Sequence, residues 1–518
     1  MEIIIAGGGT AGWLAALFLA KNHPYHNITV VASSKIGVIG AGEAVTGELM
    51  DVIVGHYSDF GIDPQDFLNK TGAMPKYGIM HRNWTPVKDS QYFGPIDGTL
   101  TGLRLPDDII VYLGSLYPDK MHMGSFFGNL YEHNISPISK VTHEFEISTF
   151  AFHFDAKLAA DYLEKVALKL PNCRLVDSQI KGSELTESGL LGSVILEDGS
   201  KIYGDFFIDG TGFSRHLIKE FSPKWVSYKK ILPVNTAIPF FLNYEQGEIP
   251  KCYSLAQAQN AGWYWEACVQ HRKGCGYVFS DDYMTVDQAL DEIQNTLGRK
   301  VDPIKIIKFD SGRLENSWIK NVFAIGLASA FAEPLEATSV HATIRSLAHL
   351  SHEFLRPTLE DTINPSSIKL CNQRINKMYD DFKDFLSSHY QGGRTDTEFW
   401  KYITNDPEAT TDFARDLKEM CKSRIPTKFD FPNYPGAASW LIWCYILIGT
   451  GQLTKESLSK YLDERTIKDS EYYLNKLSIF AEKTRLTHYS FAEHIDIVKN
   501  NNIRFNAKRG VEWHLGNI

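Results

Sequence analysis

The start of the chain alternates apolar runs with a glycine turn, in a strand–helix–strand order. A β-branched run, Ile3–Ile5, favours a buried strand. Residues 11–21 then place alanine, leucine and phenylalanine at helical spacing, with no proline before Pro24. Residues 28–31 form a second apolar run that favours another strand. The pattern therefore predicts a βαβ unit at the N-terminus.

Three glycines occupy the turn between the first predicted strand and the helix, in the spacing G-x-G-x-x-G. Glycine permits a tight turn and a close approach of backbone to phosphate, and a helix N-terminus offers free N–H groups to an anion. Within a βαβ unit this spacing is a fingerprint of dinucleotide binding. The turn supplies these candidate cofactor-binding residues: Gly7, Gly9, Thr10, Ala11 and Gly12.

The end of the second predicted strand lacks the acidic residue of a typical NAD site. That acidic residue binds the cofactor ribose, and here the strand ends in Ala32, Ser33 and Ser34. The Ser33 hydroxyl is a candidate ribose contact. The missing carboxylate argues against NAD and leaves FAD open.

Later parts of the chain change their pattern by region. Residues 173–208 alternate apolar and polar positions and predict a small antiparallel sheet that leads into a buried strand. Residues 225–315 are rich in strand signals, and residues 322–325 form a short apolar run typical of a buried parallel strand. Helical spacing dominates from about residue 340. We expect a nucleotide domain built from separated segments, an inserted mixed-sheet substrate region and a helical C-terminal part.

Composition and net charge disfavour some classes of binding partner. The chain has 518 residues, 43% of them hydrophobic, and a net charge of −9, which disfavours nucleic acid and anionic membranes as main partners. The longest apolar run, residues 440–448, is too short to span a bilayer, and we favour helix packing over pocket lining for it. No signal peptide precedes the first strand. Seven scattered cysteines favour reduced thiols in a cytoplasmic enzyme.

Several segments, taken in order, resemble those of the flavin-dependent halogenases, the group best known from tryptophan halogenases. The resemblance runs from Met1 to about Trp400. It rests on the segments GGGTAGWLAA, GAGEAVTG, GAMPKYGIMHRNW, FHFDAKLAADYL, FFIDGTGF, GWYWEACVQHRKGCGYVFS, NVFAIGLASAFAEPLEATSVH and HYQGGRTDTEFW.

The resemblance implies an α/β fold, with a Rossmann-like FAD-binding domain of the two-dinucleotide-binding flavoprotein type. An inserted mixed β-sheet substrate region and a helical C-terminal part complete this fold. The boundaries we predict are 1–100 for an FAD segment with the catalytic lysine, 101–225 for substrate-region and FAD segments, 226–315 for the mixed sheet with the tryptophan motif, 316–350 for the last FAD segment and 351–518 for the helical region.

Residue roles follow from the same resemblance. Lys76 and Glu336 match the two catalytic residues of the family, and Trp263 and Trp265 match its W-x-W-x-I-P signature. The Ile-Pro of that signature is replaced here by Ala267–Cys268. Further candidate FAD contacts are Gly40, Ala41, Glu43, Ala44, Asp209, Gly326 and Leu327.

The implied reaction separates the making of an electrophile from its use. Reduced FAD, O2 and a halide (chloride, bromide or iodide) give hypohalous acid, which passes through a tunnel to Lys76. The lysine holds it either as a hydrogen-bond donor or as a haloamine. The two tryptophans keep organic molecules away from the flavin, and Glu336 orients the electrophile and accepts the ring proton.

A halide site is expected at Thr338 and Ser339, where a turn leads into a helix whose N–H groups favour an anion. The family has glycine at the position of Ser339. Each residue also has a purely structural interpretation. Lys76 could be a solvated surface lysine, and the two tryptophans could be ordinary sheet residues. Thr338 or Ser339 could cap the helix, and the helix dipole could favour the Glu336 carboxylate.

Partners and alternatives complete the expectation. We expect an electron-rich free aromatic substrate of indole or phenol type and a separate flavin reductase, and a homo-oligomer is left open. His153 and His341 lack carboxylate partners at ligand spacing, so we expect no metal site. Gly326–Leu327 replaces the Gly-Asp of flavin hydroxylases. The alternatives are an FAD-dependent aromatic monooxygenase and a non-catalytic flavin-binding protein.

Overall fold

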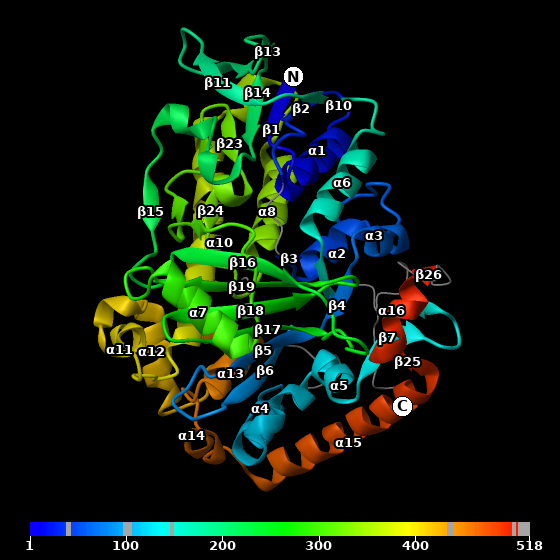
Figure 1. The fold of residues 1–518 in the computed structure, drawn as a ribbon, viewed down its shortest axis with the longest axis vertical. Helices are drawn as coiled ribbons and strands as arrows, with labels where there is room; N and C mark the ends of the chain where they lie inside the picture. The colour runs from blue at the N-terminus through cyan, green and yellow to red at the C-terminus, as the bar shows by residue number, and fades with distance from the viewer. Residues whose placement is uncertain (38–42, 97–105, 146–149, 432–439, 500–503, 506–518) are drawn as a thin grey trace. The chain divides into compact units, whose positions relative to one another are not determined.

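The structure is a computed structural model that describes residues 1–37, 43–96, 106–145, 150–431, 440–499 and 504–505 (Figure 1). Gly40 and Ala41 lie outside the described residues. The chain divides into two compact units: unit 1 comprises residues 1–72, 154–228 and 310–380, and unit 2 comprises residues 73–153, 229–309 and 381–518. This division differs from the boundaries expected above, because strand pairing joins segments far apart in the sequence. Each unit is described by itself.

Unit 1 is an α/β unit. Its regular elements are β1 (Glu2–Ala6), α1 (Thr10–Asn22), β2 (Asn27–Ala32), β3 (Glu43–Ala44), α2 (Gly47–Ile53), α3 (Pro64–Lys70), α6 (Ala156–Ala167), β10 (Cys173–Asp177), β11 (Ile180–Leu185), β12 (Leu191–Leu196), β13 (Lys201–Tyr203), β14 (Phe206–Asp209), β15 (Trp225–Ser227), β21 (Gly312–Leu314), β22 (Trp318–Ile319), β23 (Val322–Ala324), β24 (Ala330–Phe331), α8 (Thr338–Ala348), α9 (Leu359–Thr362) and the first part of α10 (Pro365–Tyr390).

A six-stranded sheet in the order β10-β2-β1-β14-β23-β22 forms the centre of unit 1. Neighbouring strands from β10 to β23 run parallel, and β22 pairs antiparallel with β23. The isoleucine run of β1 is fully buried, as its β-branched pattern predicted. Helix α1 is buried on nearly every side, because it packs on β1 and β2 and also against α6 and α8.

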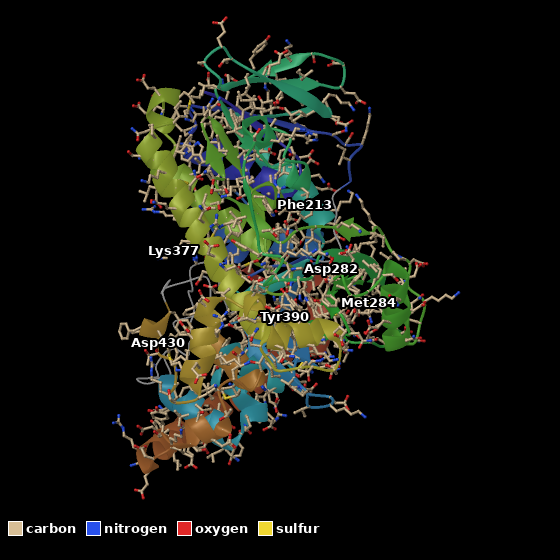
Figure 2. All side chains as sticks on the ribbon, turned by 90° about the vertical axis from the view of Figure 1, so that its left-hand side faces the viewer. Phe213, Asp282, Met284, Lys377, Tyr390 and Asp430 are labelled. Carbon is tan, nitrogen blue, oxygen red and sulfur yellow. The ribbon has the colours of Figure 1, made fainter. Side chains whose placement is uncertain are left out.

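The predicted small antiparallel sheet is present in unit 1. Strands β11, β12 and β13 pair antiparallel in chain order, and the chain then enters β14 at the centre of the parallel sheet. Another three-stranded sheet, β15-β21-β24, lies in the same unit. Phe213, labelled in Figure 2, packs edge-on against Phe331 with ring centroids 5.5 Å apart.

Unit 2 combines a large mixed sheet with helices. Its regular elements are β4 (Met74–Lys76), β5 (Gly78–Arg82), β6 (Gln91–Pro95), α4 (Pro106–Leu116), α5 (Phe126–Glu132), β7 (Ile135–Ser139), β8 (Glu144–Phe145), β9 (Ala151–Phe154), β16 (Thr236–Leu242), β17 (Tyr253–Ala258), β18 (Gly262–Cys268), β19 (Lys273–Phe279), α7 (Val286–Leu297), β20 (Ile307–Lys308), the end of α10, α11 (Glu398–Asn405), α12 (Asp412–Cys421), α13 (Trp440–Gly449), α14 (Lys455–Ser459), α15 (Glu464–Thr487), β25 (His488–Ser490), α16 (Phe491–Lys499) and β26 (Arg504–Phe505).

The sheet of unit 2 has seven strands in the order β20-β16-β19-β18-β17-β5-β6. Strand β5 pairs parallel with β17, and the other neighbours pair antiparallel. The apolar run of α13 belongs to a buried core that α4 and α15 also line, and Trp443, Cys444 and Leu447 lie inside it. The run therefore packs a core, as expected. Within the described ranges, no helix has the length and apolarity needed to cross a membrane.

Candidate active site

The glycine turn of unit 1 is shaped by close backbone contacts. Gly7 has φ +106°, and a Cβ built on it would lie 2.5 Å from the carbonyl oxygen of Gly210. A Cβ built on Gly12 would lie 1.9 Å from the carbonyl oxygen of Gly7. A Cβ on Gly9 would meet nothing within 4 Å. Two of the glycines are thus required by the fold, while Gly9 leaves the open side of the turn bare.

The open side of this turn fits a phosphate group. Gly9 caps α1 without a side-chain hydrogen bond, and the first turn of α1 carries no acidic residue. The Thr10 hydroxyl is buried and has no hydrogen-bond partner within the described part of the chain. A bare helix N-terminus and an unpartnered buried hydroxyl suit an anionic ligand. Unit 1 therefore meets the physical requirements for the pyrophosphate of a dinucleotide.

A later predicted segment reaches the same turn. Gly326 has φ +55°, and a Cβ built on it would lie 3.1 Å from Cβ of Ala11. Leu327 follows in a short 3-10 turn, Gly326–Ala328, and is partly exposed. Glycine is favoured at position 326 by both its left-handed backbone and the nearby α1. The structure thus brings this candidate segment beside the glycine turn.

The Asp209 carboxylate, at the end of β14, accepts hydrogen bonds from nearby residues of the same chain. Its Oδ1 accepts hydrogen bonds from N and Oγ1 of Thr211, at 3.0 and 2.6 Å. Its Oδ2 accepts from the backbone N–H groups of Leu217 and Ile218, at 2.8 and 2.9 Å. The carboxylate therefore shapes the loop that carries Gly210 toward Gly7. Direct contact of Asp209 with FAD stays a prediction.

Glu336 lies immediately before α8 in a strained turn. Its side chain is half-buried, and the next residue, Ala337, has φ +54°, a left-handed conformation that alanine rarely adopts. Ala337 caps α8 without a side-chain hydrogen bond, and Thr338 and Ser339 are the first two helical residues. Helix capping by Thr338 or Ser339 is thus absent. The first N–H groups of α8 are available to an anion.

The segment that begins at Glu43 approaches α8. Glu43 and Ala44 form the short strand β3, and the Thr46 hydroxyl lies 3.0 Å from Nδ1 of His341 on α8. Burial lowers the pKa of His341. In unit 1, therefore, two segments that were both expected near the flavin are hydrogen-bonded to one another.

Lys76 is a buried lysine at the end of β4 in unit 2. Its exposed fraction is 2%, and lysine is almost never fully buried without a specific reason. Strand β4 pairs with β9, which places Lys76 opposite Ala151 and Met74 opposite His153. A solvated surface lysine is therefore ruled out.

His153 links the lysine strand to the tryptophan strand. Its Nδ1 donates to the carbonyl of Cys268, at 3.1 Å, and its Nε2 accepts from the Ser254 hydroxyl, at 2.8 Å. Burial, followed by the positive charge of Lys76, lowers the pKa of His153 to about 3. A neutral imidazole thus fixes β9 and β18 together beneath Lys76. No sequence signal indicated this link beyond the histidine itself.

Trp263 and Trp265 share one face of β18, as their spacing predicted. Their ring centroids lie 6.3 Å apart. Trp263 is 2% exposed, and its Nε1–H has no hydrogen-bond partner within the described residues. The Trp265 ring lies over β19, where a Cβ on Gly276 would come within 1.9 Å of it. Gly276 was not identified from the sequence, because strand register alone places it under this ring.

An aromatic cluster occupies the same sheet face. Strand register aligns Trp265 on β18 with Ala256 on β17, and Ala256 with His81 on β5. His81 stacks on Tyr92 with centroids 4.5 Å apart and on His389 at 4.9 Å. Two strand spacings of about 4.8 Å put His81 roughly 10 Å from Trp265. Unit 2 thus carries the tryptophan pair and a buried aromatic cluster on one face.

Burial keeps His81 uncharged. Burial is the main cause that holds the pKa of His81 well below its usual range, and the charges of His389 and Lys76 add to the effect. Trp84 packs edge-on against Tyr390, which is labelled in Figure 2, with centroids 5.2 Å apart. Trp84 also packs edge-on against His81, so His81 lies beside several aromatic rings.

The candidate residues divide between the two units. Unit 1 carries the glycine turn, Gly326, Glu336 and the start of α8, whereas unit 2 carries Lys76 and both tryptophans. The pairing of Lys76 with Glu336 stays a prediction. Within unit 1, the Ser33 hydroxyl accepts a hydrogen bond from N of Lys35, at 3.3 Å, so a ribose contact by Ser33 also stays a prediction.

A parallel sheet with a glycine turn before α1 is typical of dinucleotide-binding α/β proteins, and this chain adds a second, mixed sheet and a buried lysine on β4. The family model for tryptophan halogenases matches residues 2–459. The chain therefore belongs to the tryptophan halogenase family and is a flavin-dependent halogenase. Membership implies the use of FAD and a halide and action on a small aromatic substrate.

Individual relatives agree with this assignment. The chain is 29% identical over 473 residues to tryptophan 7-halogenase KtzQ of Kutzneria sp. (strain 744), covering 82% of each protein. It is 28% identical over 488 residues to tryptophan 6-halogenase SttH of Streptomyces toxytricini, covering 87% of this chain and 90% of the relative.

Solved structures share the fold. A tryptophan halogenase from Shewanella frigidimarina NCIMB 400 superposes with a TM-score of 0.86 at 22% identity, covering 97% of this chain and 98% of the other. Xcc4156, a flavin-dependent halogenase from Xanthomonas campestris, gives a TM-score of 0.83 at 24% identity, covering 98% and 99%. These similarities confirm the expected α/β fold.

Proposed function

We propose that this enzyme halogenates a free electron-rich aromatic compound of indole or phenol type, with Lys76 and Glu336 as its catalytic residues. FAD, when bound in its reduced form, supplies the chemistry that converts O2 and a halide into hypohalous acid. The chain's own residues bind that cofactor, hold the halide, confine the electrophile and direct it to the ring. The proposal depends most on the burial of Lys76 in the core of unit 2.

Unit 1 supplies the binding groups for the cofactor and the halide. The bare turn at Gly9 and the unpartnered Thr10 hydroxyl are proposed to receive the pyrophosphate. The first N–H groups of α8, at Thr338 and Ser339, are proposed to receive chloride, bromide or iodide. Both sites use helix N-termini without side-chain caps, which leaves their donors available to anions.

Lys76 is proposed to hold hypohalous acid for the substrate. Lys76 is buried, so little water competes for its N–H groups, and its charge contributes to the lowered pKa values of His153 and His81. Its N–H groups can donate to the oxygen of the acid, or the amine can take the halogen and release water. Either route places the halogen at a fixed point against the ring, which favours a single site of substitution.

Glu336 is proposed to complete the substitution. When the halogen bonds to a ring carbon, that carbon must lose its proton. The Glu336 carboxylate stabilises the cationic ring and accepts this proton. When hypohalous acid gives its halogen directly, the hydroxide that is left takes a proton from the Lys76 ammonium and leaves as water, and the proton on Glu336 restores the ammonium. In the haloamine route, the lysine nitrogen takes up the ring proton as it loses the halogen. Ala337 holds a left-handed conformation beside it, which is a strain typical of functional turns.

The tryptophan pair is proposed to exclude the organic substrate from the cofactor side. Trp263 and Trp265 form a bulky apolar surface, and the aromatic cluster around His81 lies roughly 10 Å away on the same face. That cluster offers flat, apolar surroundings for an aromatic ring. The replacement of Ile-Pro by Ala267–Cys268 removes bulk next to the pair.

Reduced FAD is proposed to come from a separate flavin reductase, because the sequence shows no second nucleotide motif for NADH. The seven cysteines are all free thiols in the structure, which agrees with a reducing, cytoplasmic setting. A homo-oligomer remains part of the proposal.

Halide dependence tests the proposed function. The protein is supplied with FAD, a flavin reductase, NADH and a panel of indoles and phenols, with and without bromide. We expect a monobrominated product with the isotope doublet of bromine, and no turnover when the reductase is omitted. A hydroxylated product that forms equally without bromide would instead establish an aromatic monooxygenase.

A further inference from the structure

The end of β2 lacks a carboxylate, but the neighbouring strand supplies one. Strand β10 pairs parallel with β2, and the register sets Asp177 directly beside Ala32. Residues that are paired in adjacent strands project to the same face of a sheet. Asp177 is the last residue of β10, so it stands at the carboxyl edge where dinucleotides bind to such sheets.

The position of Ala32 shows that this face of the parallel sheet is the one toward the glycine turn. A Cβ built on Gly8, within the glycine turn, would lie 2.6 Å from Cβ of Ala32. The side chain at position 32 therefore faces the glycine turn, and Asp177, paired with it, extends from the same face one strand further out. One strand spacing, about 4.8 Å, separates the two backbones. A carboxylate at this place can reach a ribose whose pyrophosphate lies on the α1 N-terminus.

The Asp177 carboxylate is exposed and ionised. Its Oδ1 accepts a hydrogen bond from the backbone N–H of Ser34, at 2.8 Å, and this bond lowers the pKa of Asp177. The nearby cation Lys35 is paired with Glu197, at 3.0 Å. The hydrogen bond orients the carboxylate along the turn that follows β2, which is where Ser33 and Ser34 lie.

We propose that Asp177 binds the adenosine ribose of FAD and replaces the acidic residue that other dinucleotide sites carry on the second strand. The inference rests on the proposed FAD site and adds a residue from a different strand to it. A carboxylate that accepts from a ribose hydroxyl makes a charge-assisted hydrogen bond, which is about twice as strong as a neutral one.

The test compares FAD with an FAD analogue that lacks the 2′-hydroxyl of the adenosine ribose. Binding of each to the apoprotein is followed by flavin fluorescence, for the wild type, Asp177→Asn and Asp198→Asn. Asp198 is a matched control, because it is an exposed unit 1 carboxylate that likewise accepts from a turn N–H, that of Ser200, at 2.9 Å. Thermal unfolding of each apoprotein is recorded as well.

We expect Asp177→Asn to weaken FAD binding about tenfold and Asp198→Asn to leave it unchanged. The analogue should bind the wild type about tenfold more weakly than FAD, yet bind Asp177→Asn as tightly as FAD does. This coupling between a ribose hydroxyl and one carboxylate would not arise if Asp177 only stabilised the turn.

Two results would overturn the inference. One is equal FAD affinity in the wild type and Asp177→Asn. The other is the same loss for FAD and for the analogue, together with a lower unfolding temperature, which would make Asp177 a structural residue. If the wild type bound no FAD, the proposed function itself would fail.

Discussion

The two units build their candidate sites in different ways. In unit 1 the site is mostly backbone: bare N–H groups at the starts of α1 and α8, and glycines set by close contacts such as Gly12 against Gly7. In unit 2 the site is made of side chains: Trp265 and His81 lie on one face of the seven-stranded sheet, and Lys76 comes from β4, which pairs with β9 outside that sheet.

This difference determines how each unit responds to mutation. A backbone site is damaged by added side-chain atoms, because a methyl group blocks an approach or displaces a carbonyl. A side-chain site is damaged by removal of a functional group, while its fold survives. The exception in unit 1 is Glu336, whose proposed role depends on its carboxylate alone.

The largest effect is expected for Glu336→Gln. Loss of the proton acceptor should lower kcat for halogenation about 100-fold, the usual scale of general base catalysis. FAD affinity should stay unchanged, because the glycine turn is intact. Product formation by mass spectrometry and flavin fluorescence provide the two measurements.

The matched control is Glu315→Gln, since Glu315 is a unit 1 carboxylate that pairs with Lys224 at 3.1 Å on the surface. It should behave as the wild type does. Normal kcat in Glu336→Gln would remove the carboxylate from the proposed mechanism.

A pair of alanine variants separates ligand approach from packing in the glycine turn. Gly9→Ala meets no atom within 4 Å, so the apoprotein should keep its stability while FAD binds about tenfold more weakly. Gly12→Ala would put a methyl group 1.9 Å from a carbonyl oxygen, which should cost about 1–3 kcal/mol or more of folding free energy. Flavin fluorescence and thermal unfolding distinguish the two effects.

If Gly9→Ala bound FAD with wild-type affinity, the open side of the turn would not be the pyrophosphate site. If Gly12→Ala unfolded at the wild-type temperature, the close contact with Gly7 would not restrain the fold.

Sequence patterns predicted the features that are local. The glycine spacing predicted the turn before α1, and the i, i+2 spacing predicted the shared face of Trp263 and Trp265. Features that depend on pairing between distant segments were not predictable. Gly276 lies under Trp265 only through strand register, and Asp177 reaches the end of β2 only because β10 pairs there.

Two further features lay beyond sequence reasoning. The left-handed Ala337 could not be predicted, because alanine disfavours that conformation and only the surrounding turn imposes it. The division into two units also could not be predicted, because the chain passes between the units several times and strand pairing joins segments separated by many residues. The domain boundaries given in the sequence analysis stay a prediction. Helical spacing did predict the C-terminal region, and α10 to α16 confirm it.

A smaller effect is expected for Gly276→Ala in unit 2. The added methyl group meets the Trp265 ring, and relief of this overlap should cost about 1–3 kcal/mol of folding free energy. Gly182→Ala in strand β11 is the control, because its Cβ would make an ordinary contact, 3.7 Å from Cδ1 of Ile195. Urea unfolding of both variants measures the difference. Equal midpoints would show that the Trp265 side chain moves away from the added methyl group at no cost in folding free energy.

The last effect concerns pH. The pKa of His153 is about 3 in the folded protein against 6.5 in its ordinary state, so below pH 6.5 the unfolded chain binds a proton that the native protein excludes. Stability should fall as pH drops from 6.5 toward 3, by up to about 1.4 kcal/mol per pH unit for this group. His153→Gln should flatten that slope. An unchanged slope between pH 5 and 7 would show that His153 is protonated in the native protein.

The central claim is that one set of residues serves the making of oxidised halogen and another directs it to the ring. The most direct test measures two brominated products, one from the aromatic substrate and one from a reporter of free hypobromous acid. Both are measured for the wild type and for Lys76→Met, which preserves side-chain length. Reduced FAD, O2 and bromide are supplied with an aromatic substrate and a small reporter that is brominated by free hypobromous acid. We predict that Lys76→Met loses substrate bromination about 100-fold while reporter bromination rises. Wild-type bromination of the substrate by Lys76→Met, or loss of both products with FAD still bound, would contradict the account.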